Sequence, residues 1–273
     1  MSPVEQEIAE GGRFAFGKNW ADFLATLDEE RIREAEASLK AMLELDGLEG
    51  KRFLDVGSGS GLFSLAARRL GAEVVSFDYD PRSVACAAAL KSRFFPDDAK
   101  WRVERGSALD AAYLRSLGKF DVVYSWGVLH HTGDMWQALD NVRLPVAPGG
   151  SLFIAIYNDQ GSASRRWRRV KQLYCSGWAG KSAVCALFVP YFFLRALAAS
   201  LAAGRNVGAD YKKQRGMSMT HDWFDWLGGL PFEVAKPEEI FAFYKAKGFR
   251  LTNLKTDNGY GNNQFVLQNG EPR

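Results

Sequence analysis

The chain has 273 residues, which suits one large domain or one domain with an elaborate insertion. Its 47% hydrophobic and 25% charged residues are ordinary globular proportions, and the chain is long enough to bury a full core. Three cysteines, Cys86, Cys175 and Cys185, form no CxxC or CxxH pair, which argues against a disulfide framework and a structural zinc site. The acidic N-terminal segment lacks the apolar core of a secretory signal, so we expect a cytoplasmic protein.

The net charge of +3 is unevenly distributed. From Ser162 to Met219 the chain carries eleven basic residues and one acid, Asp210, a local balance of +10 that leaves −7 for the remainder. The basic residues are Arg165, Arg166, Arg168, Arg169, Lys171, Lys181, Arg195, Arg205, Lys212, Lys213 and Arg215. Either these cations pair with acids elsewhere in the chain, or the segment engages an anionic partner.

The first periodic pattern lies near the N-terminus and predicts a helix from about Asp28 to Leu45. Its apolar residues recur at helical spacing: Ile32, Ala35, Leu39, Met42 and Leu43.

The next pattern is FLDVGSGSG, residues 53–61. It is a short apolar run that ends in an acid and is followed by glycine at every second position. This pattern predicts a buried strand that turns sharply into a helix from about Leu62 to Gly71. Glycine permits the dihedral angles of such a turn and lets a ligand approach bare backbone. The free N–H groups at the start of the helix favour anionic or polar ligand groups, although a turn without a ligand is an alternative.

The spacing of this turn separates three classes of ligand. A P-loop needs Lys-Ser/Thr after its last glycine, and a dinucleotide fingerprint needs a small residue at the position of Leu62. The remaining pattern, DxGxGxG from Asp55 to Gly61, resembles the first motif of the class I S-adenosylmethionine (SAM) methyltransferases. The resemblance implies that SAM is the cofactor, with S-adenosylhomocysteine as product. It implies that the cofactor contacts Asp55, Gly57, Ser58, Gly59 and Gly61.

A second acid ends the next apolar run, residues 73–78. Asp78 follows Gly57 by 21 residues, the spacing at which an α/β fold brings a carboxylate beside a ribose. We therefore predict that Asp78 binds the ribose of the cofactor, with Tyr79 beside it. Its neighbour Asp80 is expected to cap the helix that follows.

Residues 101–105 and 120–126 predict the third and fourth strands. In the resembled family, the turn after the third strand lines the adenine ring, commonly with an Asp where this chain has Ser107. We expect Ser107 and Ala108 to contact the base. The segment from Gly127 to Thr132 resembles the part of the family beside the reactive methyl group, and Trp126, directly before it, joins the predicted cofactor contacts.

The remaining elements complete a sheet. Residues 151–157 predict a fifth strand, and residues 249–256 and 263–267 predict two closing strands, antiparallel to each other. The resemblance implies an α/β fold with a seven-stranded Rossmann-like methyltransferase sheet, helices on both faces, an N-terminal helical layer and a helical lid insertion before the sixth strand.

We expect the chain to divide into three parts. Residues 1–50 would form an N-terminal helical cap, in which Trp20 could cover the cofactor as this layer often does in the family. Residues 51–157 and 237–268 would form the SAM-binding core. Residues 158–236 would form the lid that contacts the acceptor.

The three histidines are the candidate catalytic residues. His130 and His131 follow the fourth strand at its carboxyl end, where open α/β sheets bind ligands, and His221 lies in the insertion beside Asp222. A histidine could remove the acceptor's proton because its free pKa lies near neutrality. Alternatively, the pair shapes a turn and His221 lies in a surface loop. These residues lack metal-ligand spacing, so we predict no metal.

An apolar run with consequences for location extends from 183 to 203 in the insertion. It could span a bilayer only with Pro190 and Arg195 inside, which is costly. The alternatives are a buried lid helix pair and an interfacial helix flanked by Arg and Lys. The interfacial helix would imply peripheral contact of residues 165–203 with an anionic inner membrane face.

These observations together predict methyl transfer from SAM to an oxygen or nitrogen of a small-molecule, glycan-like or lipid-linked acceptor. Two alternatives remain. An RNA methyltransferase would use the basic insertion to contact phosphates, and a non-catalytic SAM-binding adaptor would bind the cofactor without turnover. The acceptor itself is not specified by the sequence.

Overall fold

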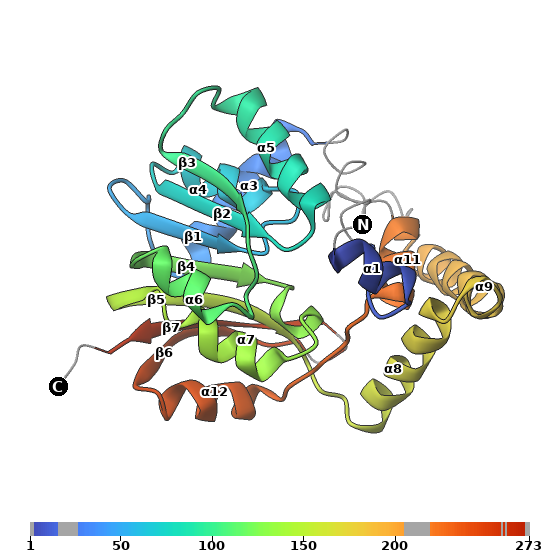
Figure 1. The fold of residues 1–273 in the computed structure, drawn as a ribbon. Helices are drawn as coiled ribbons and strands as arrows, with labels where there is room; N and C mark the ends of the chain where they lie inside the picture. The colour runs from blue at the N-terminus through green and yellow to red at the C-terminus, as the bar shows by residue number, and fades with distance from the viewer. Residues whose placement is uncertain (1–2, 16–26, 205–218, 258, 260, 271–273) are drawn as a thin grey trace. The chain divides into compact units, whose positions relative to one another are not determined.

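The computed structural model describes residues 3–15, 27–204, 219–257, 259 and 261–270, in two compact units (Figure 1). The sheet unit comprises Asp28–Gln160 and Glu233–Arg273, and the helical unit comprises Met1–Leu27 and Gly161–Phe232. The expected cap of residues 1–50 is thus divided between the two units, because the helix of its second half belongs to the sheet unit.

Seven strands form the sheet, in the order β3-β2-β1-β4-β5-β7-β6. The strands are β1 (Arg52–Val56), β2 (Glu73–Asp78), β3 (Trp101–Arg105), β4 (Phe120–Trp126), β5 (Val146–Tyr157), β6 (Phe249–Lys255) and β7 (Asn262–Asn269). The first five are parallel, and β7 is antiparallel to both β5 and β6. The order reverses between β1 and β4, which is where such sheets bind ligands at their carboxyl ends. The predicted seven-stranded sheet is confirmed.

Helices cover both faces of this sheet (Figure 1). On one face lie α6 (Ala111–Ser116), α7 (Met135–Val142) and α12 (Pro237–Lys245), whose apolar residues share a core with Leu54, Val123, Ile154 and Phe265. On the other lie α4 (Leu62–Arg69) and α5 (Pro81–Phe94), with α3 (Glu29–Leu43) packed against α4. A short 3-10 helix, η1 (Leu129–His131), follows β4.

Aspartate side chains start four of these helices by accepting a backbone N–H in the first turn, which satisfies a donor that the helix itself leaves unpaired. The caps are Asp28, Asp80, Asp110 and Asp134. The predicted cap is among them, since Asp80 accepts the N–H of Arg82 at 2.9 Å. These caps set the residue at which each of the four helices starts.

The helical unit has a small core of its own. Its described helices are α1 (Pro3–Ala9), α8 (Ser162–Cys175), α9 (Trp178–Ala203) and α11 (Met219–Gly228). Tyr174, Val184 and Leu227 are buried among aromatic neighbours. The N–H of Phe14 donates to the carbonyl of Leu230 at 3.0 Å, which is one reason why the N-terminal residues group with the insertion.

Candidate functional site

The loop between β1 and α4 has a backbone conformation that favours glycine. Gly57, Gly59 and Gly61 all have positive φ angles, of 76°, 53° and 83°. The N–H of Gly57 donates to the carbonyl of Phe77 at 2.9 Å, which ties the loop to the end of β2. A Cβ at Gly57 would lie 2.3 Å from Cγ1 of Val128, so the loop also packs closely on the segment after β4.

Asp78 connects this loop to the end of β2. One carboxylate oxygen accepts the N–H of Gly59 and the other accepts the N–H of Asp80, both at 2.9 Å. Each oxygen has a second lone pair that can accept from a ribose hydroxyl. Tyr79 lies between the two acids and is partly exposed. The structure therefore brings together the two acid-ended strands and the glycine turn that the sequence singled out.

The turn after β3 is held beside Asp78. The N–H of Gly106 donates to the Asp78 carbonyl at 3.1 Å, and the side chain of Asn141 donates to the Ala108 carbonyl at 3.0 Å. The hydroxyl oxygen of Ser107 accepts the N–H of Leu109 at 3.2 Å and can still donate its own proton. The residues predicted to contact adenine thus lie next to the residue predicted to contact ribose.

Asp55 lies beneath the glycine loop as a buried acid. Its carboxylate accepts the hydroxyl of Ser64 at 2.6 Å, and it is the strand partner of Tyr124. The pKa of Asp55 is raised to about 7, mainly by burial; the Ser64 hydrogen bond acts in the opposite direction, and the charge of Asp78 contributes to the rise. The hydroxyls of Tyr124 and Ser58 are buried and have no hydrogen-bond partner among the described residues. Four buried polar side chains, those of Asp55, Ser58, Ser64 and Tyr124, therefore lie in or beside the loop.

The segment after β4 carries the histidine pair. His130 is fully buried, and its Nδ1 accepts the N–H of Tyr157 at 3.3 Å, so the neutral ring carries its proton on Nε2. The ring centroids of His130 and Tyr157 are 4.0 Å apart, and those of His130 and His131 are 4.4 Å apart. His131 is only partly buried, and Trp126 at the end of β4 is exposed. All four residues lie at the carboxyl edge of the sheet.

A group of carboxamides at the same edge escaped the sequence analysis. Asn158 donates to the carbonyls of Asp257 and Gly259 at 3.1 and 3.3 Å, directly after β5. At the start of β7, Asn262 Oδ1 and Asn263 Nδ2 are buried without a hydrogen-bond partner among the described residues. The signal that could have found them is the rule that ligands bind beyond the carboxyl ends of parallel strands, applied to β5 and to the antiparallel strand beside it.

Two predicted site residues cannot be placed in this geometry. Trp20 lies outside the described residues, and so does the side chain of His221, whose backbone belongs to α11. Both therefore stay predictions. The other predicted cofactor and catalytic residues all belong to the sheet unit.

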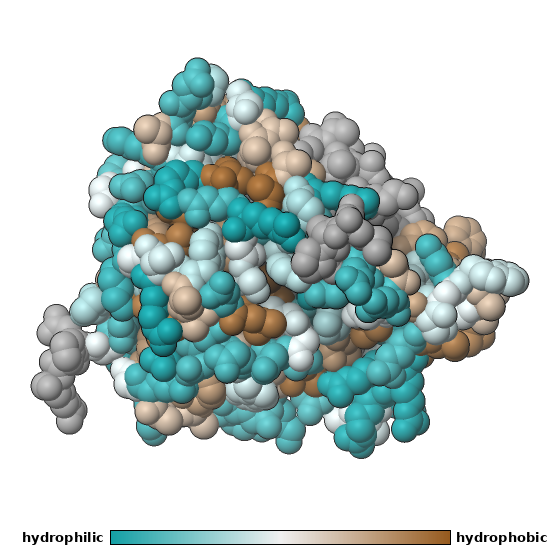
Figure 2. Space-filling view, viewed as in Figure 1, coloured by the Kyte–Doolittle hydropathy of each residue, from teal (hydrophilic) through white to brown (hydrophobic). Residues whose placement is uncertain are grey.

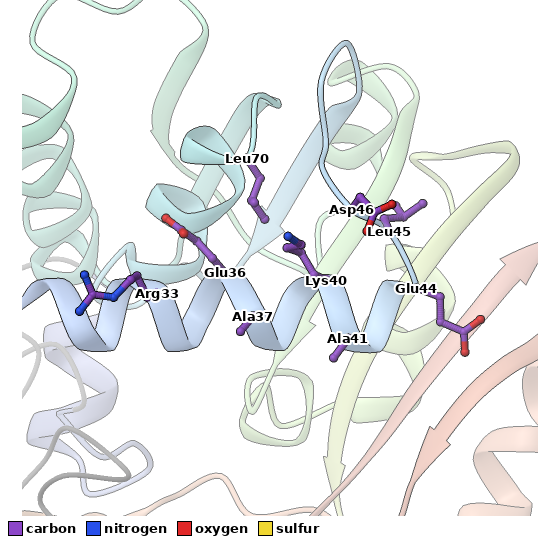
Figure 3. Close-up of a pocket in the computed structure, with 9 residues that line it drawn as sticks. All are labelled: Arg33, Glu36, Ala37, Lys40, Ala41, Glu44, Leu45, Asp46 and Leu70. Carbon is purple, nitrogen blue, oxygen red and sulfur yellow. The ribbon is translucent and has the colours of Figure 1, made fainter.

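A separate open groove of about 670 Å³ runs along α3 (Figure 3). In Figure 3 the side chains of Glu36 and Lys40 rise from α3 on the side of Leu70. The groove is lined by Arg33, Glu36, Ala37, Lys40, Ala41, Glu44, Leu45, Asp46 and Leu70. This groove contains none of the predicted site residues. The candidate site therefore lies at the carboxyl ends of the strands and not in this groove.

Comparison with known proteins gives consistent findings. A family model described as a methyltransferase domain matches residues 27–200. A ubiquinone biosynthesis O-methyltransferase of Escherichia coli is 34% identical over 119 residues, which are 43% of this chain and 47% of that protein. The chain thus aligns with about half the length of the curated relatives it matches.

Two solved structures share the fold. Magnesium protoporphyrin IX methyltransferase from Synechocystis PCC 6803, with bound SAH, has a TM-score of 0.53 and 13% identity over 88% of this chain and 84% of that chain. An O-methyltransferase family protein from Burkholderia thailandensis has a TM-score of 0.54 and 13% identity over 89% of this chain and 58% of that chain.

Proposed function

The chain belongs to the methyltransferase-domain family, and from that premise we propose that it moves the methyl group of SAM to a hydroxyl oxygen of a small-molecule acceptor. A nitrogen acceptor, and a glycan-like or lipid-linked molecule that carries the acceptor atom, belong to the same proposal. An oxygen acceptor is favoured because the Escherichia coli relative is an O-methyltransferase.

The observation that carries the proposal is the contact between Asp78 and the glycine loop. A carboxylate that holds the N–H of Gly59 is of the chemical type that also accepts hydrogen bonds from ribose hydroxyls. Gly59 has a positive φ angle and no side chain, so a ligand can approach bare backbone near the start of α4. These features suit SAM, and we assign Ser107 and Ala108 to contact with its adenine.

SAM supplies an activated methyl group when it is bound. The chain must then hold the acceptor at attack distance, align it and take its proton. His130 is suited to orientation, because its Nδ1 already accepts the N–H of Tyr157. His131 is partly exposed at the same edge, so we assign it the role of general base.

The acceptor would be bound on the β5 side of the edge. Asn262 and Asn263 each present a buried polar atom without a partner among the described residues, and such atoms favour a ligand that can hydrogen-bond to them. A phenol or sugar hydroxyl meets that requirement, as it can both donate and accept.

The test compares two neighbouring aspartates. Asp78→Ala removes a predicted ribose acceptor and should weaken SAM binding by about 1.5–3 kcal/mol. Asp80→Ala, the matched control, removes the helix cap and should lower stability by about 1 kcal/mol while leaving SAM affinity unchanged. Calorimetry measures the affinity of each, and circular dichroism measures each one's stability.

The acceptor is then sought by mass spectrometry of a cell extract incubated with methyl-labelled SAM and the protein. A product labelled by the wild type but not by Asp78→Ala supports the proposal and identifies the acceptor. Equal SAM affinity in both aspartate variants would remove Asp78 from the site. Normal SAM binding with no labelled product would favour the non-catalytic adaptor.

A further inference from the structure

Helix α9 exposes an apolar surface of unusual length. It has 26 residues, about 39 Å at 1.5 Å per residue, and by length and composition it could cross a membrane. Within α9, which the structure describes completely, only Val184 is buried, whereas Leu187, Leu194 and Leu201 are 67%, 62% and 75% exposed. Figure 2 shows apolar residues gathered over α9. Soluble monomers seldom expose so large a patch without a partner for it.

Eight exposed apolar residues of α9 share one side of the helix, while Trp178 and Tyr191 are exposed on other sides. At about 100° per residue the eight residues span an arc of about 120°, which we call the apolar arc. It consists of Ala183, Ala186, Leu187, Pro190, Phe193, Leu194, Leu197 and Leu201. The other side carries Val184, Phe188 and Phe192, which pack in the core of the helical unit. One side of α9 is therefore held by the protein, and the apolar arc is open.

Both charges of α9 lie away from the apolar arc. Arg195 and Lys181 project at least about 140° from its centre, and the amino group of Lys181 lies 5.4 Å from the ring centroid of Tyr174. A helix lying in the membrane plane can bury the arc and keep both cations outside the hydrocarbon. A spanning helix would have to bury Arg195 and separate Phe188 from its core, so the membrane plane is favoured.

The preceding helix, α8, supplies unpaired positive charge. The side chains of Arg165, Arg166 and Arg169 are exposed and form no ion pair or hydrogen bond with any described residue, while the Arg168 side chain donates to the carbonyl of Phe232 at 3.1 Å. Figure 2 shows hydrophilic residues over the N-terminal part of α8. The pairing of these arginines with acids of the chain, one of the alternatives left by the sequence, is not observed among the described residues.

The two helices form one packed element. The ring centroids of Trp167 on α8 and Phe188 on α9 are 5.3 Å apart. A Cβ at Gly180 would lie 2.1 Å from the carbonyl oxygen of Leu173, so the start of α9 lies directly on the end of α8. The arginines and the apolar arc therefore move together as parts of one surface element.

We propose that α8 and α9 bind the surface of an anionic lipid bilayer, with the apolar arc in the acyl region and the α8 arginines near the lipid phosphates. The inference does not depend on methyl transfer. It would bring the protein to the surface where a lipid-linked acceptor, already part of the proposed function, or another membrane-dissolved molecule would lie.

Flotation of the full chain on vesicles tests the proposal. We expect binding to phosphatidylcholine mixed with phosphatidylglycerol, no binding to phosphatidylcholine alone, and weaker binding as salt rises. Leu187→Glu with Leu194→Glu should reduce binding at least about tenfold, because two leucines lose their burial in the lipid. The matched control is Phe241→Glu with Leu254→Glu, at positions 39% and 43% exposed in the sheet unit, and it should bind normally.

A second pair of variants tests the charges. Changing Arg165, Arg166 and Arg169 to Gln should weaken vesicle binding about 100-fold, from about 1 kcal/mol for each cation near the surface. Changing Arg33, Arg93 and Arg115 to Gln removes equal charge from exposed positions of the sheet unit and should have little effect. Each variant should keep wild-type SAM affinity, which separates this test from that of the proposed function, and circular dichroism should show wild-type helix content, which shows that α8 and α9 are folded.

Several results would overturn the proposal. One is the absence of flotation at low salt, and another is an equal loss of binding in the control variants. Resistance to extraction with alkaline carbonate would indicate a spanning helix. A dimer that dissociates in the Leu187→Glu, Leu194→Glu variant, without vesicle binding, would make a second copy the partner of the arc. Salt-sensitive RNA binding through the three arginines, without vesicle binding, would assign them to nucleic acid.

Discussion

At the scale of single residues, burial decides the charge of Asp55. The pKa of this carboxyl rises from 3.8 to about 7 because burial disfavours the charged form. Between these two values the folded protein keeps a proton that the unfolded chain has released. The contribution of Asp55 to the free energy of unfolding is therefore greatest below about pH 4, and it is lost as the pH rises to about 7.

The prediction is a pH-dependent difference between the wild type and Asp55→Asn. Asparagine cannot ionise, and its amide oxygen can still accept the Ser64 hydroxyl. The difference in unfolding free energy, variant minus wild type, should rise by up to about 1.4 kcal/mol per pH unit between about pH 4 and 7. Above about pH 7 the difference should stay constant. Urea denaturation over a pH series measures it. A difference that stays constant across the lower range as well would mean that Asp55 is ionised in the folded protein.

At the scale of elements, the glycine loop and the segment after β4 depend on each other. Gly57 and Gly127 have nearly equal φ angles, 76° and 74°, but different surroundings. A Cβ at Gly57 would meet the side chain of Val128, whereas a Cβ at Gly127 would have nothing within 4 Å. A substitution at Gly127 therefore introduces backbone strain alone, whereas the same substitution at Gly57 introduces backbone strain and a steric clash.

Alanine at these two positions gives a matched prediction. Gly127→Ala should cost about 1–2 kcal/mol of stability, from the left-handed backbone conformation alone. Gly57→Ala should cost a further 1–3 kcal/mol or so, because Val128 must be displaced. Adding Val128→Ala should recover part of that second loss. Denaturant unfolding measures all three variants, and equal losses at the two glycines would show that the Val128 contact yields without cost.

The sequence predicted these elements well because their signals are local. The apolar runs that end in Asp55 and Asp78, the glycine turn and the Asp80 cap each occupy a few consecutive residues, and the structure has each one where it was expected. The polar group of Asp55, Ser64 and Tyr124 was not predicted, because it depends on which strand pairs with β1. No local pattern contains that information.

The carboxamides at the β5 edge escaped prediction for the same reason. Asn158 and Asn262 are distant in sequence and meet only because β7 pairs antiparallel with β5, where Tyr157 lies opposite Asn262. The division into units was equally beyond reach, since the contact of Phe14 with Tyr174, at 6.4 Å between ring centroids, joins the N-terminal residues to the insertion. The polar group at Asp55, the carboxamides and the division into units all depend on contacts between residues that are distant in the sequence.

At the scale of the whole molecule, the two units carry separable binding surfaces. The predicted cofactor contacts that the structure describes all belong to the sheet unit, and the apolar arc with its arginines belongs to the helical unit. A ligand that binds the folded form of one unit stabilises that unit by mass action, by about 2.7 kcal/mol at a concentration 100 times its dissociation constant. The two ligands should therefore protect different parts of the chain.

Hydrogen exchange followed by mass spectrometry tests this separation. SAM should slow exchange in peptides covering residues 53–61 and 76–80, where the glycine loop and Asp78 are hydrogen-bonded to each other. Anionic vesicles should slow exchange in residues 183–203 and leave the glycine loop unchanged. With both ligands present, the two patterns should add. Protection of the glycine loop by vesicles alone would show instead that the membrane surface and the cofactor site are coupled, and SAM affinity should then rise on vesicles by the factor that vesicle affinity rises with SAM.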